Sequence, residues 1–219
     1  MDPMTLDATG ASPVLPDERF ALPAQEEQLT RAADALAGRG VAVEILDDAD
    51  AARARIRELV PEGSAVFTSS SETLRLSGIG DDLDSSGRYR AIRPLVTSMD
   101  RATRMDEIRS LIAAPQVVVG SLAAVTETGS LLAASASGSQ IPAYAGGAAQ
   151  RIWVAGAQKV VPDLETALRR IETYAYPLED RRARAVYGSP SAISEVLIVN
   201  GDLVPGRTRL LLLRQAIGY

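Results

Sequence analysis

Two side chains that carry much of enzyme chemistry are missing from this sequence. Its 219 residues contain no cysteine and no histidine. The absence of cysteine excludes disulfides, thiolate nucleophiles and thiolate-ligated zinc or iron–sulfur clusters within the chain. The absence of histidine excludes a Ser–His–Asp triad and any haem or metal site built on imidazole. Carboxylates, hydroxyls, arginines and backbone groups are therefore left for chemistry, and we expect no bound metal.

Lysine and aromatic residues are scarce as well. Lys159 is the single lysine, so Schiff-base chemistry has only that side chain to use. Aromatic residues make up 4% of the chain, which leaves few platforms for the stacking of nucleic-acid bases. The net charge of −5 also opposes nucleic acids and anionic membranes, because both require a basic face. We therefore expect no nucleic-acid partner.

Long apolar runs are absent too. No stretch approaches the ~20 apolar residues of a membrane span, and residues 1–18 lack the features of a secretory signal. We therefore expect a cytoplasmic protein. Residues 1–24 are rich in small and polar residues and are predicted to be a flexible tail, which leaves residues 25–219 for a single domain.

Helical and strand patterns alternate along the chain. Apolar residues recur at helical spacing over 26–37, and short apolar runs over 41–46 and 64–68 predict strands. This alternation is typical of a parallel sheet that helices cover on both faces. We therefore predict an α/β fold with a mainly parallel sheet flanked by helices. The other predicted elements are helices over 48–59, 72–77, 101–114 and 163–174, strands over 117–119, 131–134, 151–155 and 209–213, and a helix or strand over 192–199.

A run of hydroxyls follows the predicted strand over 64–68. In a parallel sheet such a loop lies at the carboxyl edge, where ligands bind. Its hydroxyls and the free N–H groups of the next helix suit an anion. The alternative is that one serine caps that helix. The candidate ligand-binding residues here are Ser69, Ser70, Ser71 and Thr73.

A second hydroxyl-rich segment, 120–130, follows the predicted strand over 117–119. Its single acid is Glu127. A carboxylate among small apolar residues has a raised pKa or needs a donor, and either property suits a general base or nucleophile. The alternative is pairing with an arginine or with backbone N–H groups. The segment matches neither the Walker motif nor the dinucleotide fingerprint. The candidate ligand-binding residues here are Gly120, Ser121, Thr128, Gly129 and Ser130.

The remaining candidates are a glycine–serine turn and isolated cations. Gly188 and Ser189 precede an apolar run, where they either complete an anion pocket or form a plain turn. Arg151 begins a predicted strand and Lys159 follows it, so both are candidates to hold an anionic ligand. The arginine run over 181–184 is more typical of a solvated surface.

The order of these segments resembles one known family. Residues 117–121 followed by 123–131 resemble the central motif of the LUD (lactate utilization) domain. Residues 69–74, 156–165 and 187–192 are similar to its other segments, so the resemblance covers about 25–219. It implies the α/β fold shared by ribose-5-phosphate isomerase, glucosamine-6-phosphate deaminase and CoA-transferases. The family includes protein C of lactate utilization, which works beside iron–sulfur subunits that oxidise L-lactate to pyruvate.

The resemblance implies two functions. In the first, the chain is a cluster-free accessory subunit or a binder of a small anionic metabolite, with iron–sulfur lactate-oxidation subunits as its partners. In the second, it is an independent enzyme for a phosphorylated or CoA-linked metabolite. Its Glu127-Thr128-Gly129 then acts like the glutamate of CoA-transferases, with Glu127 as base or nucleophile. The ligand classes left open are a nucleotide, CoA and phosphate. A homodimer is expected only because it is the commonest oligomer.

Overall fold

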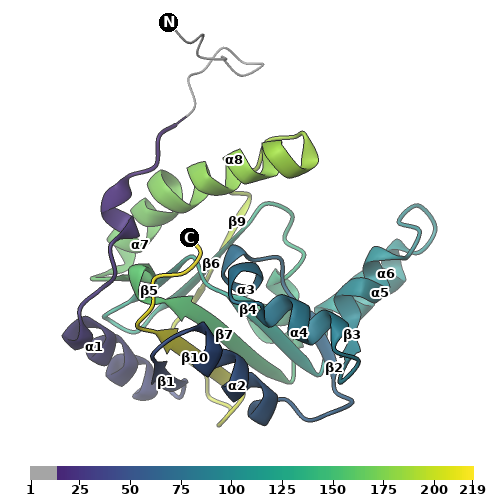
Figure 1. Cartoon of the computed structure of the whole chain (residues 1–219), viewed down its shortest axis with the longest axis horizontal. Helices are drawn as coiled ribbons and strands as arrows, with labels where there is room; N and C mark the ends of the chain where they lie inside the picture. Colours follow the sequence, from purple (N-terminus) through teal and green to yellow (C-terminus); the bar gives the residue numbers. More distant parts are fainter. Residues whose placement is uncertain (1–13) are drawn as a thin grey trace, which may run out of the picture.

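Six parallel strands form the central sheet of the computed structural model, which describes residues 14–219 (Figure 1). Their order in space is β1-β10-β7-β4-β2-β3. All five neighbouring pairs run parallel. The strands are β1 (Ala42–Leu46), β2 (Ala65–Thr68), β3 (Arg90–Ala91), β4 (Val117–Ser121), β7 (Gln150–Gly156) and β10 (Thr208–Leu213).

Alternate side chains of this sheet enter two separate cores. In β4, Val117 and Val119 join one core while Val118 joins the other. Leu211 and Leu210 of β10 divide in the same way, as the two-residue period of a strand requires. Helices therefore cover both faces. The first face carries α2 (Ala49–Leu59), α3 (Glu72–Leu76) and α4 (Ile79–Ser85), and the second carries α1 (Glu26–Ala37), α5 (Ile92–Thr97) and α6 (Met105–Ala113).

A second sheet, which the sequence did not predict, packs beside the first. Its strand order is β8-β5-β6-β9, and β6 runs antiparallel to both of its neighbours. The sequence analysis missed β5 because a three-residue strand is too short to show a period. The strands are β5 (Ala124–Thr126), β6 (Leu131–Ser135), β8 (Val160–Val161) and β9 (Glu195–Val199).

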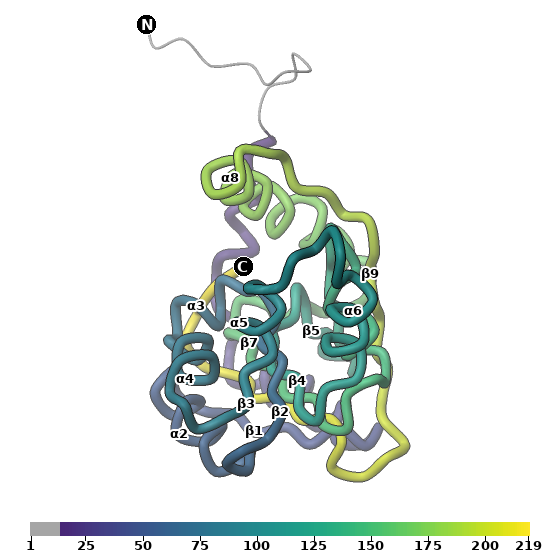
Figure 2. Tube along the Cα trace, turned by 90° about the vertical axis from the view of Figure 1, so that its right-hand side faces the viewer, coloured from purple at the N-terminus to yellow at the C-terminus, as the bar shows by residue number. Residues whose placement is uncertain are grey.

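A helical layer follows the second sheet. It comprises α7 (Leu164–Arg170), the π-helical turn η4 (Ile171–Ala175) and α8 (Tyr176–Tyr187), and α8 lies at one end of the molecule (Figure 2). The helix predicted over 163–174 therefore continues much further. The three shorter helical turns are η1 (Glu18–Ala21), η2 (Ala143–Gly147) and η3 (Ala157–Lys159).

The outcome for the α/β prediction is clear. An α/β fold with a mainly parallel sheet is confirmed, and the segment over 192–199 resolves into the strand β9.

The predicted tail lies partly outside the described residues. From Asp17 onward it makes contacts, because Asp17 N donates to Thr173 O and Phe20 packs against Tyr174. Among residues 14–219, no helix combines the length and the apolar character needed to cross a membrane.

A buried ion pair stabilises the amino-terminal ends of β7 and β10. Arg151 donates to Asp202 Oδ2 at 2.6 Å, and the two side chains are 2% and 0% exposed. Asp202 also accepts hydrogen bonds from Arg207, from the Thr208 hydroxyl and from the Val204 N–H. Burial alone would raise the pKa of Asp202, but these donors hold that pKa well below its usual range. The carboxylate is therefore charged at neutral pH.

Replacing this carboxylate tests the ion pair. Asp202→Asn leaves the Arg151 cation buried without a counter-charge, so we expect a loss of about 3–5 kcal/mol in the free energy of unfolding. Urea denaturation at pH 7 measures it. Because the folded-state pKa is depressed, the stabilisation is present above the unfolded pKa of about 4 and is lost as the pH falls below it. The difference between the two proteins should therefore shrink in acid.

The matched control is Arg207→Gln, because Arg207 is 28% exposed, so solvent screens its interaction with Asp202. In this variant Asp202 also keeps Arg151 as its counter-charge. It should destabilise the protein clearly less than Asp202→Asn. Equal unfolding midpoints for wild type and Asp202→Asn would contradict the role given to the pair.

Candidate functional site

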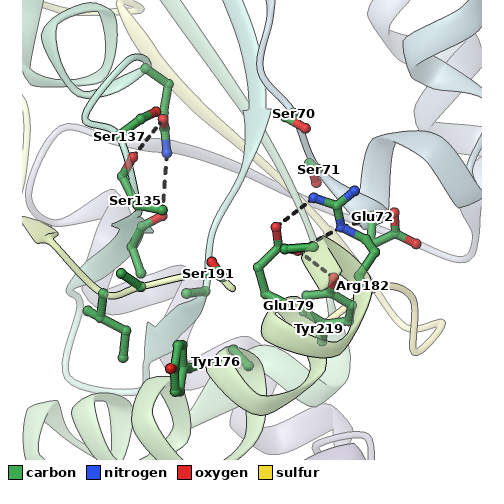
Figure 3. A pocket seen from close by; sticks show the side chains of 18 of the residues that line it. Ser70, Ser71, Glu72, Ser135, Ser137, Tyr176, Glu179, Arg182, Ser191 and Tyr219 are labelled. Carbon is green, nitrogen blue, oxygen red and sulfur yellow. Dashed lines mark hydrogen bonds and ion pairs between the residues drawn. The ribbon is translucent and has the colours of Figure 1, made fainter. Parts of the chain in front are cut away.

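A pocket of about 360 Å³ opens where the carboxyl ends of three central strands meet. Ser69–Ser71 follow β2, Ser121 ends β4, and Lys159 comes soon after β7. The opposite wall comes from α8 and the segment after it (Figure 3). Thirteen of its 28 lining residues carry hydroxyls and nine of these are serines, so we call this site the serine pocket. Its hydroxyl-bearing residues are Ser69, Ser70, Ser71, Ser121, Ser135, Ser137, Ser139, Ser189, Ser191, Tyr144, Tyr176, Tyr187 and Tyr219.

The floor of the serine pocket depends on a close approach between a tyrosine and a glycine. The Tyr144 hydroxyl lies 2.7 Å from Ser69 Oγ. Burial raises the pKa of Tyr144 to about 12, so the phenol is neutral. A Cβ at Gly120 would overlap both the Tyr144 phenol and Ser69 Oγ. Gly120, predicted as a ligand contact, is therefore not among the lining residues. It lies behind the wall, where the absence of a side chain leaves room for Tyr144.

The loop after β2 divides its hydroxyls among different tasks. Ser71 caps α3, since its Oγ accepts a hydrogen bond from Leu74 N at 3.4 Å. This is the capping alternative raised by the sequence. Ser70 is exposed at the pocket mouth. Thr73 is buried and receives a hydrogen bond from Lys159, so it supports the pocket without lining it.

Lys159 is buried at the wall of the serine pocket. It is 1% exposed, and its Nζ donates to Thr73 Oγ1 at 2.8 Å, to Ser121 Oγ at 3.0 Å and to Leu122 O at 2.9 Å. No carboxylate is among its hydrogen-bond partners in the described part of the chain. Burial lowers the pKa of Lys159 well below its usual range, and the Arg170 cation lowers it further. Both effects shift the protonation equilibrium of Lys159 toward the neutral amine.

Arg170 adds a second buried cation behind the same wall. Its Nε donates to Gln158 O at 3.1 Å and its Nη1 to Ala123 O. Its Nη2 has no hydrogen-bond partner within residues 14–219. Burial lowers the pKa of Arg170 to about 10, so it stays charged at neutral pH. This fixed charge adds to the effect of burial in disfavouring a proton on Lys159.

The α8 side of the pocket carries a paired charge cluster. Arg182 donates to both carboxylate oxygens of Glu179, at 2.6 and 2.8 Å, and the Tyr219 hydroxyl donates to Glu179 at 2.6 Å (Figure 3). Glu72 lies 3.9 Å from Arg182 and also pairs with Arg75. The sequence analysis placed Arg182 on a solvated surface, because no local pattern separates it from the adjacent arginines.

Glu127 lies outside the serine pocket. It sits in the turn between β5 and β6, where it accepts hydrogen bonds from Gln28 Nε2 at 2.8 Å and from Arg31 Nε at 2.7 Å. Both donors belong to α1, so the carboxylate joins the second sheet to that helix. This contact is the arginine pairing that the sequence left open as the alternative.

The remaining sequence candidates lie elsewhere too. Thr128 and Ser130 bond within their own turn or to Asn200, and Gly129 adopts a left-handed φ of 88° there. Arg151 belongs to the buried pair with Asp202. Gly188 ends α8 in the left-handed conformation. The pocket therefore brings together six of the candidates, which are Ser69, Ser70, Ser71, Ser121, Lys159 and Ser189.

Comparison with known proteins fits this fold. The sequence profile of the LUD domain matches residues 29–213. The chain belongs to the LUD domain family. A solved structure similar to this LUD domain is that of a DUF162 family protein from Deinococcus radiodurans, with a TM-score of 0.51 and 13% identity. The match covers 85% of this chain and 95% of that chain, and at this identity it shows the fold alone. No curated protein matches the sequence.

Glu127→Gln tests whether the carboxylate of this LUD domain has more than a structural role. Glu127 is 13% exposed and Arg31 58% exposed, so solvent screens the pair and we expect a loss below about 1 kcal/mol. Urea denaturation measures the loss. Because Glu127 is remote from the serine pocket, ligand affinity should not change. A tenfold change in the affinity of the serine pocket for its ligand would show that Glu127 contributes to binding.

Proposed function

We propose that this LUD domain is a cluster-free ligand-binding protein of lactate utilization, which holds a small carboxylate metabolite in the serine pocket. The observation that carries the proposal is the pocket's lining of hydroxyls beside a buried lysine that has no carboxylate partner. Since the chain has no cysteine and no histidine, the electrons of L-lactate oxidation would pass through iron–sulfur partner subunits.

The chemistry of the lining suits a 2-hydroxy or 2-oxo acid. Serine hydroxyls both donate and accept hydrogen bonds, so they match a carboxylate and a hydroxyl or carbonyl on the next carbon. Glu179 and Glu72 are each neutralised by arginines. The acidic groups of the pocket therefore do not repel an anion, and Arg182 and Arg170 supply positive potential.

The alternative of an enzyme that uses Glu127 on a phosphorylated or CoA-linked metabolite has less support. Gln28 and Arg31 hold that carboxylate away from the serine pocket. The pocket volume lies within the range of sites for larger ligands, so CoA and phosphate belong in the same experiment. If CoA binds and neither L-lactate nor pyruvate binds, the result would favour the alternative ligand class.

Two neighbouring arginines test the proposal. Isothermal titration calorimetry should detect binding of L-lactate or pyruvate to the wild-type chain. Arg182→Gln leaves Glu179 without its cation, so the pocket becomes more negative and affinity for either acid should fall at least about tenfold, or ~1.4 kcal/mol. Arg181→Gln is the matched control, because Arg181 is exposed and lies outside the pocket lining.

Two results would contradict the proposal. The first is the absence of heat with both acids at millimolar concentration. The second is an equal loss of affinity in the Arg181 and Arg182 variants, since that would indicate general charge attraction rather than a pocket.

A further inference from the structure

The surroundings of Lys159 differ from those of a lysine that braces a fold. A buried ammonium is costly unless a carboxylate compensates it. The three partners of Lys159 Nζ within residues 14–219 are instead the hydroxyls of Thr73 and Ser121 and the carbonyl of Leu122. Asp202 compensates the buried Arg151, but the buried Arg170 near Lys159 has no carboxylate partner among the described residues either. Two uncompensated cationic side chains at one wall of a pocket call for a chemical explanation.

The same surroundings make the amine a nucleophile. Proteins activate lysine by desolvating it or by placing a second cation beside it, and Lys159 has both, because it is 1% exposed and lies near Arg170. Lys159 also belongs to the wall of the serine pocket. Ser121 and Leu122, two of its hydrogen-bond partners, line the serine pocket together with Lys159 itself. A ligand in the pocket therefore lies next to the amine.

We propose that Lys159 forms a reversible imine with the carbonyl carbon of a 2-oxo acid bound in the serine pocket. This inference rests on the proposed function, since it needs a carboxylic acid in that pocket. It narrows the ligand class to acids that carry a carbonyl. A 2-hydroxy acid such as lactate has no electrophilic carbon at that position and can bind only without a covalent bond, so the site distinguishes the oxidised from the reduced acid.

The step balances without an oxidant or a reductant. The deprotonated Nζ attacks the carbonyl carbon with its lone pair, so a C–N bond forms and the π bond of the carbonyl breaks. The oxygen takes up the proton that the nitrogen loses, which gives a carbinolamine. Loss of that oxygen as water breaks the C–O bond and leaves a C=N bond. Ser121 Oγ and Thr73 Oγ1 lie within hydrogen-bond distance of Nζ, where they can pass protons between the amine and the departing oxygen. Hydrolysis reverses the sequence.

Borohydride trapping of the full chain tests this inference, with pyruvate as the probe. The reagent reduces an imine to a stable amine, so Lys159 should gain the mass of a reduced pyruvate adduct, detected by peptide mass mapping. Since Lys159 is the single lysine, the amino terminus of the purified chain is the other primary amine and serves as an internal reference. L-lactate should give no adduct.

Three controls make the result specific. Lys159→Met removes the amine, keeps a side chain of similar length and should lose the adduct. Glu127→Gln, which lies outside the pocket, should retain it. In the urea-unfolded wild type, labelling of Lys159 relative to the amino terminus should fall about tenfold or more, because the pocket no longer holds the acid beside the amine.

The outcomes separate this inference from the proposed function. Calorimetric binding of pyruvate without an adduct on Lys159 overturns the imine and leaves the ligand-binding function standing. Absence of both binding and adduct overturns the two together. Equal labelling of Lys159 in folded and unfolded chains overturns the imine, because it would show that no site is required.

Discussion

The parallel register of the central sheet is the constraint on which the rest of this molecule depends. Because β2, β4, β7 and β10 all run in one direction, their carboxyl ends meet at a single edge. Segments that are far apart in the sequence are thereby brought together, and Ser69, Ser121 and Lys159 line one pocket. A parallel sheet must also bury both of its faces, which accounts for the two cores on either side of it. The position of the site follows from this register rather than from any single motif.

The sequence predicts what depends on the central strands and misses what depends on the second sheet. Apolar runs such as 117–119 identify buried strands, and the rule that ligands bind at the carboxyl edge places Ser69–Ser71 and Ser121 correctly at one edge. The remainder of the second hydroxyl-rich segment, 124–130, lies elsewhere, because β5 leads it away from that edge toward α1. Glu127 lies in this part of the chain, and no local sequence pattern predicts the change of direction.

The helical layer explains why most polar groups of the pocket are uncharged hydroxyls. Arg182 on α8 reaches Glu179 on its own helix and approaches Glu72 on α3. The cluster therefore connects α8 to α3, the helix that follows the loop after β2. Its charges are used for this connection, and hydroxyls are left as the polar groups that face the pocket. Sequence alone does not reveal such a division, since an arginine run of this kind is equally typical of a solvated surface.

The buried basic side chains at the two ends of β7 differ in whether a carboxylate compensates them. At its beginning, Arg151 is neutralised by Asp202, which Arg207 and Thr208 also stabilise, so the charges are satisfied inside the protein. Just beyond its end, Lys159 donates only to neutral acceptors, and the nearest charge that affects it is the Arg170 cation. A fold that had merely to tolerate a lysine there would gain from a nearby carboxylate or from an apolar side chain. The arrangement instead lowers the pKa of an amine at the wall of the pocket. This costs stability and suits chemistry with a carbonyl.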